Sequence, residues 1–240
     1  MPVMQTNPPS RTPVALVTGA SRGLGRALVA RLTADGWHVV VDARGRRSLA
    51  EAIAPLPAAR VTAIPGDVCD DWHRAALAAA VESLGRLDLL VNNASVLGPS
   101  PRPALADYPL RELERVYAAN ALAPLALGQL VLALLERTGG RIVNVSSDAA
   151  VEAYAGWGGY GSSKAALDQI TAVLAAEHPA TRIYSFDPGD MATELHQSAF
   201  PGEDIRDRPS PASVVPALMR LVEGDLPSGR YRVDALRAAA

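Results

Sequence analysis

The alternation of short apolar runs with longer helical segments constrains the fold of this chain more than any other feature. The runs are apolar throughout, which is typical of parallel strands buried on both faces. Strands that alternate with helices form right-handed βαβ units, so we predict a doubly wound, mostly parallel seven-stranded α/β sheet with helices on both faces. The predicted strands are 14–17, 38–41, 61–64, 87–91, 141–145, 182–186 and 229–234, and the predicted helices are 25–34, 48–54, 71–83, 110–137 and 160–177.

The length and composition fit one domain. A chain of 240 residues suits a large α/β domain, and 49% apolar residues suffice for a core. We expect residues 13–240 to form it. Residues 1–12 are rich in Pro, Ser, Thr and Asn and lack the apolar segment of a signal peptide, so they predict a disordered tail. The segment around 192–210 is polar and broken by Pro and Gly, which predicts an irregular, mobile substrate lid.

Charge and cysteine content exclude several classes of function. A net charge of −2 does not fit a nucleic-acid binder. No apolar run reaches the roughly 18 uncharged residues of a membrane span, and the longest, 121–135, contains Pro124, Gly128 and Gln129 and predicts a buried helix. The single cysteine, Cys69, cannot form an internal disulfide, which fits the cytoplasm. We expect no metal site.

A glycine-rich turn, Thr18-Gly-Ala-Ser-Arg-Gly-Leu-Gly25, follows the first predicted strand. Gly19 permits a tight turn, Gly23 lets the backbone approach a pyrophosphate, and Gly25 allows close helix packing. The free N–H groups at the start of the next helix bind anions. The turn therefore predicts a dinucleotide site in a Rossmann-type fold.

The same turn fits a second enzyme class. Gly19-Ala-Ser21-Arg-Gly23 matches the nucleophile elbow of α/β hydrolases, with Ser21 as the nucleophile. A hydrolase also needs a downstream histidine, and only His196 is suitably placed. The elbow would normally come later in the sheet, so a serine hydrolase is retained only as an alternative.

Lys164 is the only lysine in the chain, and every other basic side chain apart from the histidines is arginine. Because ammonium and guanidinium are not interchangeable, we expect the lysine where guanidinium cannot serve. Tyr160 lies four residues earlier, on the same face of a predicted helix. An ammonium beside a phenol stabilises the phenolate and lowers a pKa that is normally about 10. The pair thus predicts a proton donor that works near neutral pH.

Further motifs follow in a specific order. They are Asp67-Val68, Asn92-Asn-Ala94, Asn120, Asn144-Val-Ser-Ser147, Tyr160-x-x-x-Lys164 and Pro188-Gly-Asp-Met-Ala-Thr193. Together with the glycine turn, they resemble the short-chain dehydrogenase/reductase family over nearly the whole chain. Ser95 departs from the family pattern, which usually has Gly there, and its side chain narrows the space beside the cofactor.

The resemblance implies an NAD(P)-dependent oxidoreductase acting on CH–OH and C=O groups. Tyr160 would be the general acid in reduction, and Lys164 would lower its pKa and hold the nicotinamide ribose. Ser147 would polarise the substrate carbonyl, and Asn120 would anchor a water that relays protons to Lys164. The implied cofactor-binding residues are Gly19, Ser21, Arg22, Gly23, Leu24, Gly25, Ala43, Arg44, Asp67, Val68, Asn93, Ala94, Tyr160, Lys164, Pro188, Gly189, Met191 and Thr193. A protein that binds the cofactor without turnover is a further alternative.

The end of the second predicted strand bears on the choice between NAD and NADP. Asp42 lies there, and an acid in this region commonly binds the ribose hydroxyls of NAD. Counted from Gly36, however, the NAD-selecting position of the family falls on Ala43. Arg44 and Arg22 could bind a 2′-phosphate with charge-assisted forks. We therefore predict NADP(H), with Asp42 paired to one of these arginines.

The substrate would lie beside Ser147 and Tyr160. Trp157 and Phe200 would suit a flat polycyclic ligand. The segments 147–157 and 187–204 resemble ketoreductases of aromatic-polyketide assembly in antibiotic biosynthesis, including the angucyclinone type. The family also pairs through the helices that here would be 110–137 and 160–177, which implies a homo-oligomer, a tetramer or a dimer. The predicted substrate walls are Val96, Leu97, Ala149, Tyr154, Trp157, Met191, His196 and Phe200.

Overall fold

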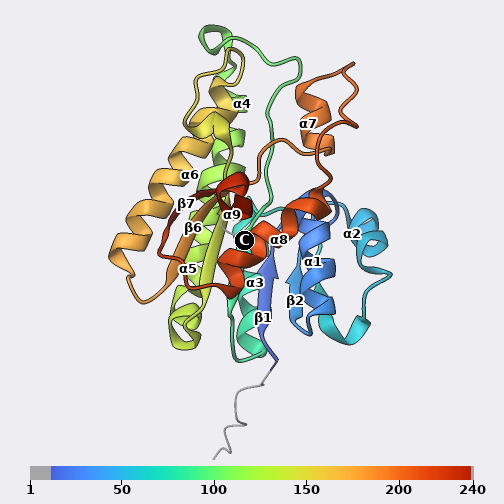
Figure 1. Cartoon of the computed structure of the whole chain (residues 1–240), viewed down its shortest axis with the longest axis vertical. Helices are drawn as coiled ribbons and strands as arrows, with labels where there is room; N and C mark the ends of the chain where they lie inside the picture. Colours follow the sequence, from blue (N-terminus) through green and yellow to red (C-terminus); the bar gives the residue numbers. More distant parts are fainter. Residues whose placement is uncertain (1–11, 239–240) are drawn as a thin grey trace, which may run out of the picture.

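A parallel sheet in the order β3-β2-β1-β4-β5-β6-β7 forms the centre of the computed structural model (Figure 1). The model describes residues 12–238, so the predicted tail lies outside the described residues except for Thr12. After β3 the chain crosses back to β4, beside β1, and parallel sheets bind ligands at such a switch point. The strands are β1 Val14–Val17, β2 His38–Val41, β3 Val61–Ala63, β4 Leu89–Asn92, β5 Arg141–Val145, β6 Arg182–Asp187 and β7 Gly229–Arg232.

The predicted doubly wound fold is confirmed, and the sheet is parallel throughout because β7 also pairs parallel to β6. Helices cover both faces. One apolar core joins the sheet to α1 Gly23–Ala34, α2 Arg46–Ile53, α8 Pro211–Glu223 and α9 Val233–Ala238. The other joins it to α3 Asp71–Ser83, α5 Ala123–Thr138 and α6 Gly158–Glu177. Val17 of β1 lies in the first core and Leu16 in the second, since successive side chains of a strand point to opposite faces.

Helix boundaries follow the capping signals of the sequence. The Asp70 carboxylate accepts a hydrogen bond from the backbone N–H of Trp72 at the start of α3. Ser210 caps α8, with Pro211 at the first helical position. The predicted helix 110–137 is divided into α4 Leu110–Tyr117, a π-helical turn η3 Ala118–Leu122, and α5. Short 3₁₀ turns lie at η1 Ala58–Arg60, η2 Leu105–Asp107 and η4 Asp148–Ala150.

Two predictions near the C-terminus need correction. The segment around 192–210 is not irregular throughout, because α7 spans Glu194–Ala199. Thr193 accepts a hydrogen bond from the backbone N–H of His196 and so caps this helix. In Figure 1, α7 stands apart from the sheet, at the upper right. The last predicted strand ends at Arg232, where the chain turns into α9.

The continuous helical segment Leu110–Thr138 is long and apolar enough to cross a membrane, which the sequence inspection did not anticipate. Its composition also suits a core helix, and 56% of its most apolar window is buried inside the protein. The buried side chains Leu127, Val131 and Leu134 pack in the second core. This packing agrees with the buried helix predicted at 121–135.

Candidate active site

A large cleft opens at the carboxyl ends of the strands. Its volume of about 1760 Å³ exceeds the roughly 300–1,000 Å³ of a typical small-molecule pocket. All residues predicted to bind cofactor or substrate line it except Gly25. Ser147, Tyr160 and Lys164 also line it, whereas Asn120 is fully buried behind them. The fold therefore brings together residues that are far apart in the sequence.

The glycine turn has the conformation that its sequence predicts. Gly19 and Gly23 have φ angles of 68° and 55°, in the left-handed region that disfavours side chains. A Cβ on Gly19 would lie 2.9 Å from the Cα of Ala94, and one on Gly25 would lie 2.5 Å from the carbonyl oxygen of Gly19. No side chain caps the N-terminus of α1. Its N–H groups therefore face the cleft as an anion-binding end.

Asp42 is part of the fold beneath this turn. Its side chain is 1% exposed. One carboxylate oxygen accepts a hydrogen bond from the Gly19 N–H at 2.8 Å, and the other lies 3.0 Å from Nε2 of His73. The prediction that Asp42 pairs with Arg22 or Arg44 is therefore wrong, because the carboxylate points inward and holds the turn.

Two exposed arginines remain beside the cofactor end of the cleft. Arg22 forms an ion pair with Glu194 of α7. Arg44 lies next to buried Ala43 on the cleft wall, and it has no ion pair among residues 12–238. Exposed ion pairs contribute little stability, about 0–1 kcal/mol, so Arg22 can exchange its partner for a ligand. Both guanidiniums are thus available to an anionic group.

Asn93 supports the turn more than the sequence suggested. Its side-chain amide donates to the carbonyl oxygens of Thr18 at 2.9 Å and Gly19 at 3.1 Å. In return, the Thr18 hydroxyl accepts from the backbone N–H groups of Asn93 and Ala94, both at 3.0 Å. These bonds join the ends of β1 and β4 and fix the wall where a cofactor would lie.

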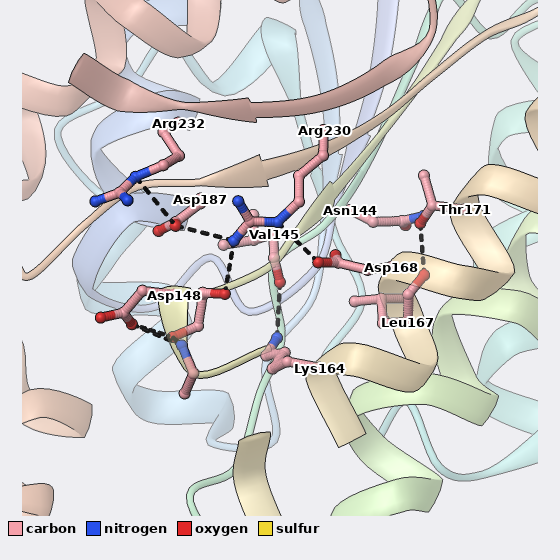
Figure 2. A network of polar contacts seen from close by, with 12 residues as sticks. Asn144, Val145, Asp148, Lys164, Leu167, Asp168, Thr171, Asp187, Arg230 and Arg232 are labelled. Atoms are coloured by element: carbon pink, nitrogen blue, oxygen red, sulfur yellow. Dashed lines mark hydrogen bonds and ion pairs between the residues drawn. The ribbon is translucent and has the colours of Figure 1, made fainter. Parts of the chain in front are cut away.

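Tyr160 and Lys164 lie on the same face of α6, and both are buried, with 8% and 2% of each exposed. The Lys164 ammonium donates to the carbonyl oxygen of Val145 at 2.7 Å and lies 5.6 Å from the centre of the Tyr160 ring. The backbone at the end of β5 therefore holds the lysine near the tyrosine, and Figure 2 shows the bond between Lys164 and Val145.

Burial dominates the acid–base properties of this pair. It raises the pKa of the Tyr160 phenol to about 12, although hydrogen bonds with Ser95 and Ser147 lower it. Burial also lowers the pKa of the Lys164 ammonium to about 8, while the Asp168 carboxylate raises it. The predicted lowering of the Tyr160 pKa is thus not seen in the protein by itself. At neutral pH the phenol keeps its proton, and the lysine is mostly cationic.

Ser147 begins the 3₁₀ turn η4 that follows β5. Its hydroxyl donates to Oδ1 of Asp148 at 2.9 Å and accepts from the backbone N–H of Ala149 at 3.2 Å. The hydroxyl of Tyr154 donates to Oδ2 of Asp148 at 3.1 Å. Asp148, which the sequence analysis did not single out, therefore connects the predicted catalytic Ser147 to Tyr154 of the predicted substrate wall.

Asn120 lies in the π-helical turn η3, a feature often found at functional sites. Its Oδ1 accepts from the Ser95 hydroxyl at 3.1 Å and from the Val96 N–H at 2.9 Å. Its Nδ2 donates to the Val96 carbonyl at 2.9 Å and to the Ser163 hydroxyl at 3.0 Å. The Asn120 side chain is therefore fully engaged by protein groups, Ser95 among them.

Aromatic rings form the far wall of the cleft. The Trp157 ring lies edge-on to Tyr160, with 5.8 Å between ring centres, and 5.9 Å from Phe200. His196 stacks on Phe200 at 4.9 Å. Arg102, which the sequence analysis missed, lies 4.0 Å above the Trp157 ring.

Two nitrogens of this wall are buried without a hydrogen-bond partner among residues 12–238: Nη1 of Arg102 and Nε2 of His196. Leaving a polar group in this state typically costs about 1–3 kcal/mol. Because His196 lines the cleft, its Nε2 is placed to bind a polar atom of a ligand.

The hydrolase alternative gains no geometric support, since no histidine in the described part of the chain bonds to Ser21. His196 instead lies 3.5 Å from a carboxylate oxygen of Asp190. Within residues 12–238, no group of three or more His, Cys, Asp or Glu could hold a metal ion.

Comparisons with known proteins point to one family. The family described as short chain dehydrogenase matches residues 13–204. Mouse sepiapterin reductase is 36% identical over 201 residues, which cover 78% of this chain and 77% of the reductase. A short-chain dehydrogenase from Pseudomonas syringae superposes with a TM-score of 0.86 at 32% identity, covering 92% of this chain and 94% of that one.

A second solved structure bears on the cofactor. A short-chain dehydrogenase from Shigella flexneri, in complex with NADP, superposes with a TM-score of 0.85 at 27% identity. The match covers 92% of this chain and 97% of that protein.

Proposed function

Since the chain belongs to the short-chain dehydrogenase/reductase family, we propose that it uses NADPH to reduce a carbonyl group of a small molecule. Membership makes it an oxidoreductase acting between CH–OH and C=O. The observation that carries the proposal is the convergence of Ser147, Tyr160 and Lys164 in one cleft with the glycine turn. A binding protein without turnover would not need this set.

The residues present fit a nicotinamide dinucleotide. The left-handed Gly19 and Gly23 leave the backbone bare beside the N-terminus of α1, where a pyrophosphate binds. A Cβ on Gly23 would approach Thr193 to 3.5 Å. Asp67 and Val68 would hold the adenine, and Lys164 the nicotinamide ribose. The cofactor, when bound, supplies the hydride.

The chain's own residues supply orientation and a proton. Tyr160 is protonated at neutral pH, because burial raises its pKa to about 12. It donates this proton to the carbonyl oxygen as negative charge develops there. Ser147 turns its hydroxyl from Asp148 to the same oxygen. The Lys164 cation stabilises the resulting phenolate.

NADPH is proposed over NADH because Arg22 and Arg44 flank the predicted position of the 2′-phosphate. Asp42 does not oppose them, since its carboxylate is buried and bonded to Gly19 and His73. The Shigella relative, which binds NADP, supports the same choice.

The aromatic wall favours a flat substrate. Trp157 and Phe200 present rings on which a polycyclic carbonyl compound would stack. None of the relatives described above is a ketoreductase of polyketide assembly, so the aromatic-polyketide substrate rests on the sequence resemblance alone. A compound like sepiapterin, after which the mouse relative is named, is an alternative to the polyketide substrate.

The assembly is proposed to be a homo-oligomer in the cytoplasm, a tetramer or a dimer. Exposed Leu110 of α4, Leu130 of α5 and Val173 of α6 are large apolar groups. A second copy would cover them. Sedimentation at micromolar concentration tests this, and a monomer there contradicts it.

The decisive experiment incubates the protein with NADPH and a panel of aromatic and aliphatic ketones, and follows the loss of NADPH absorbance. Turnover of at least one flat aromatic ketone supports the proposal. NADPH binding without any turnover, although Tyr160 and Lys164 are intact, would favour the binding-only alternative.

A further inference from the structure

We propose that Arg230, on the last strand of the sheet, is a positioning residue that holds Ser147, Lys164 and the cofactor loop after β6 in register. The inference rests on the proposed function for the roles of Ser147 and Lys164. It adds a residue that no motif identifies and that lies outside the cleft.

The Arg230 guanidinium contacts three segments of the site (Figure 2). Its Nε donates to Oδ2 of Asp168 on α6 at 2.9 Å. Its Nη2 donates to the backbone carbonyl of Ser147 at 2.9 Å and to Oδ2 of Asp187 at 3.0 Å. One side chain of β7 thus joins the ends of β5 and β6 to the catalytic helix.

Each partner lies beside a predicted functional residue. Asp168 is one helical turn after Lys164, and Ser147 is bound directly through its own carbonyl. Asp187 ends β6, and its Oδ1 accepts from the N–H of Gly189 in the predicted cofactor loop at 3.0 Å. A displacement of Arg230 would therefore act on all three functional segments together.

The charged side chains of this network are largely buried, so the loss of any one of them is costly. Asp187 is 2% exposed at its side chain, Asp168 15% and Arg230 26%. Removing one member of such a pair leaves a charge without its partner. A lysine cannot replace the arginine, because one ammonium cannot reproduce the fork that reaches carboxylates on two elements.

The network also sets the charge around Lys164. The ionisable groups near it are Tyr160 and Asp168 on its own helix, Arg230 on β7, Asp187 at the end of β6 and Asp148 after β5. Figure 2 shows all of them except Tyr160, whose ring centre lies 5.6 Å from the ammonium. The Asp168 carboxylate raises the pKa of Lys164, and Arg230 shares that carboxylate. Without Arg230 the full charge of Asp168 acts on the lysine, so its pKa rises. Without Asp168 the lysine loses its anionic neighbour, so its pKa falls.

The test compares R230K, R230M and D168N with the control R232M. Arg232 is on the same strand and also faces Asp187, but it is 56% exposed and 3.8 Å away. We expect R230K and R230M to lose roughly ten- to hundredfold in kcat, the order expected for a small misplacement of catalytic groups, and R232M to stay near wild type. Equal losses in R230M and R232M would overturn the proposal.

A direct readout of Lys164 separates positioning from general loosening of the fold. Because the chain has one lysine, protein labelled with ¹³Cε-lysine gives a single side-chain signal whose titration reports the Lys164 pKa by NMR. We expect an upward shift in R230M and a downward shift in D168N. Loosening alone would admit water and raise the pKa in both variants, and an upward shift in D168N overturns the proposal.

This readout needs no turnover, so it separates the two proposals. Opposite shifts in a protein that reduces no carbonyl would reject the proposed reduction and keep the role of Arg230. Normal turnover with an unchanged Lys164 pKa in both variants would reject the role of Arg230 and keep the proposed reduction.

Discussion

The two sides of the cleft differ in how completely their polar side-chain atoms are hydrogen-bonded within the protein. Behind the proposed catalytic residues, Asn120 uses all of its side-chain hydrogen-bonding capacity on protein partners. On the aromatic wall, Nε2 of His196 is buried without a partner among residues 12–238. Complete bonding rigidifies a site, whereas unpartnered atoms remain free to bind a ligand. We conclude that the side around Asn120 is rigid before any ligand binds, whereas the aromatic wall has a polar atom left to contact a substrate.

Loss of the proposed proton donor should cause the largest fall in kcat. Tyr160→Phe removes the hydroxyl and little else, so we expect kcat to fall about 10²–10⁴-fold with NADPH affinity unchanged. The control Tyr231→Phe removes a hydroxyl that donates to the Pro227 carbonyl, away from the cleft, and should be active. A kcat near wild type in Tyr160→Phe would show that another group donates the proton.

Lys164→Arg keeps the charge and should still cost about a hundredfold in kcat. The buried ammonium donates to the Val145 carbonyl at 2.7 Å, and a wide planar guanidinium does not fit the position of a compact ammonium. Steady-state kinetics and NADPH titration should show both kcat and cofactor affinity reduced. Near-normal kinetics would remove the special role inferred from the single lysine.

Arg44→Ala tests a proposed contact with the cofactor. Arg44 belongs neither to the residues around Tyr160 nor to the aromatic wall. A hydrogen bond to a charged group contributes about 1.5–3 kcal/mol, which is roughly tenfold or more in kcat/KM. We expect the loss for NADPH and little change for NADH. Arg47→Ala, in which Arg47 pairs with Glu51 on the surface, is the matched control. A wild type that prefers NADH would contradict the assignment.

Arg102→Met tests the substrate side. The thioether keeps packing against Trp157 while removing the unpartnered guanidinium nitrogen. We expect KM to rise by up to about tenfold, because the cation–π contact that supports the Trp157 ring contributes roughly 0.5–2 kcal/mol, with kcat nearly unchanged. If kcat falls and KM does not, Arg102 acts through the catalytic residues, and the two sides of the cleft are not independent.

Ser95→Gly should have the smallest effect. The Ser95 hydroxyl bonds to Asn120 and lowers the pKa of Tyr160. Its loss raises that pKa, and a phenolate is needed only in the direction of alcohol oxidation. The alkaline rise of the oxidation rate should therefore move to higher pH, while reduction at neutral pH changes by no more than about tenfold. A shift toward lower pH would contradict the sign of this contact.

The sequence predicted the sheet and most helix boundaries, and nearly every residue that it assigned to cofactor or substrate lines the cleft, because local patterns and short motifs carry that information. It did not predict contacts that only the fold creates. Arg230 lies 62 positions from Asp168 and 83 from Ser147, on a short strand with no distinctive pattern. Arg102 and Asp148 likewise gain meaning only from the rings and hydroxyls packed beside them. The direction of the Asp42 side chain could not be read from its position at the end of β2.

The buried Asp42 also has a consequence for redesign of cofactor preference. A designer who knew only the sequence would mutate Asp42, and that change would remove a partner of both Gly19 and His73 and weaken the turn itself. The nearby Arg44 lines the cleft and is exposed, so the preference that we propose for NADPH can be altered there without loss of these bonds. In this protein, the residue that supports the turn and the residue that we propose to select the cofactor are close in the sequence but separable.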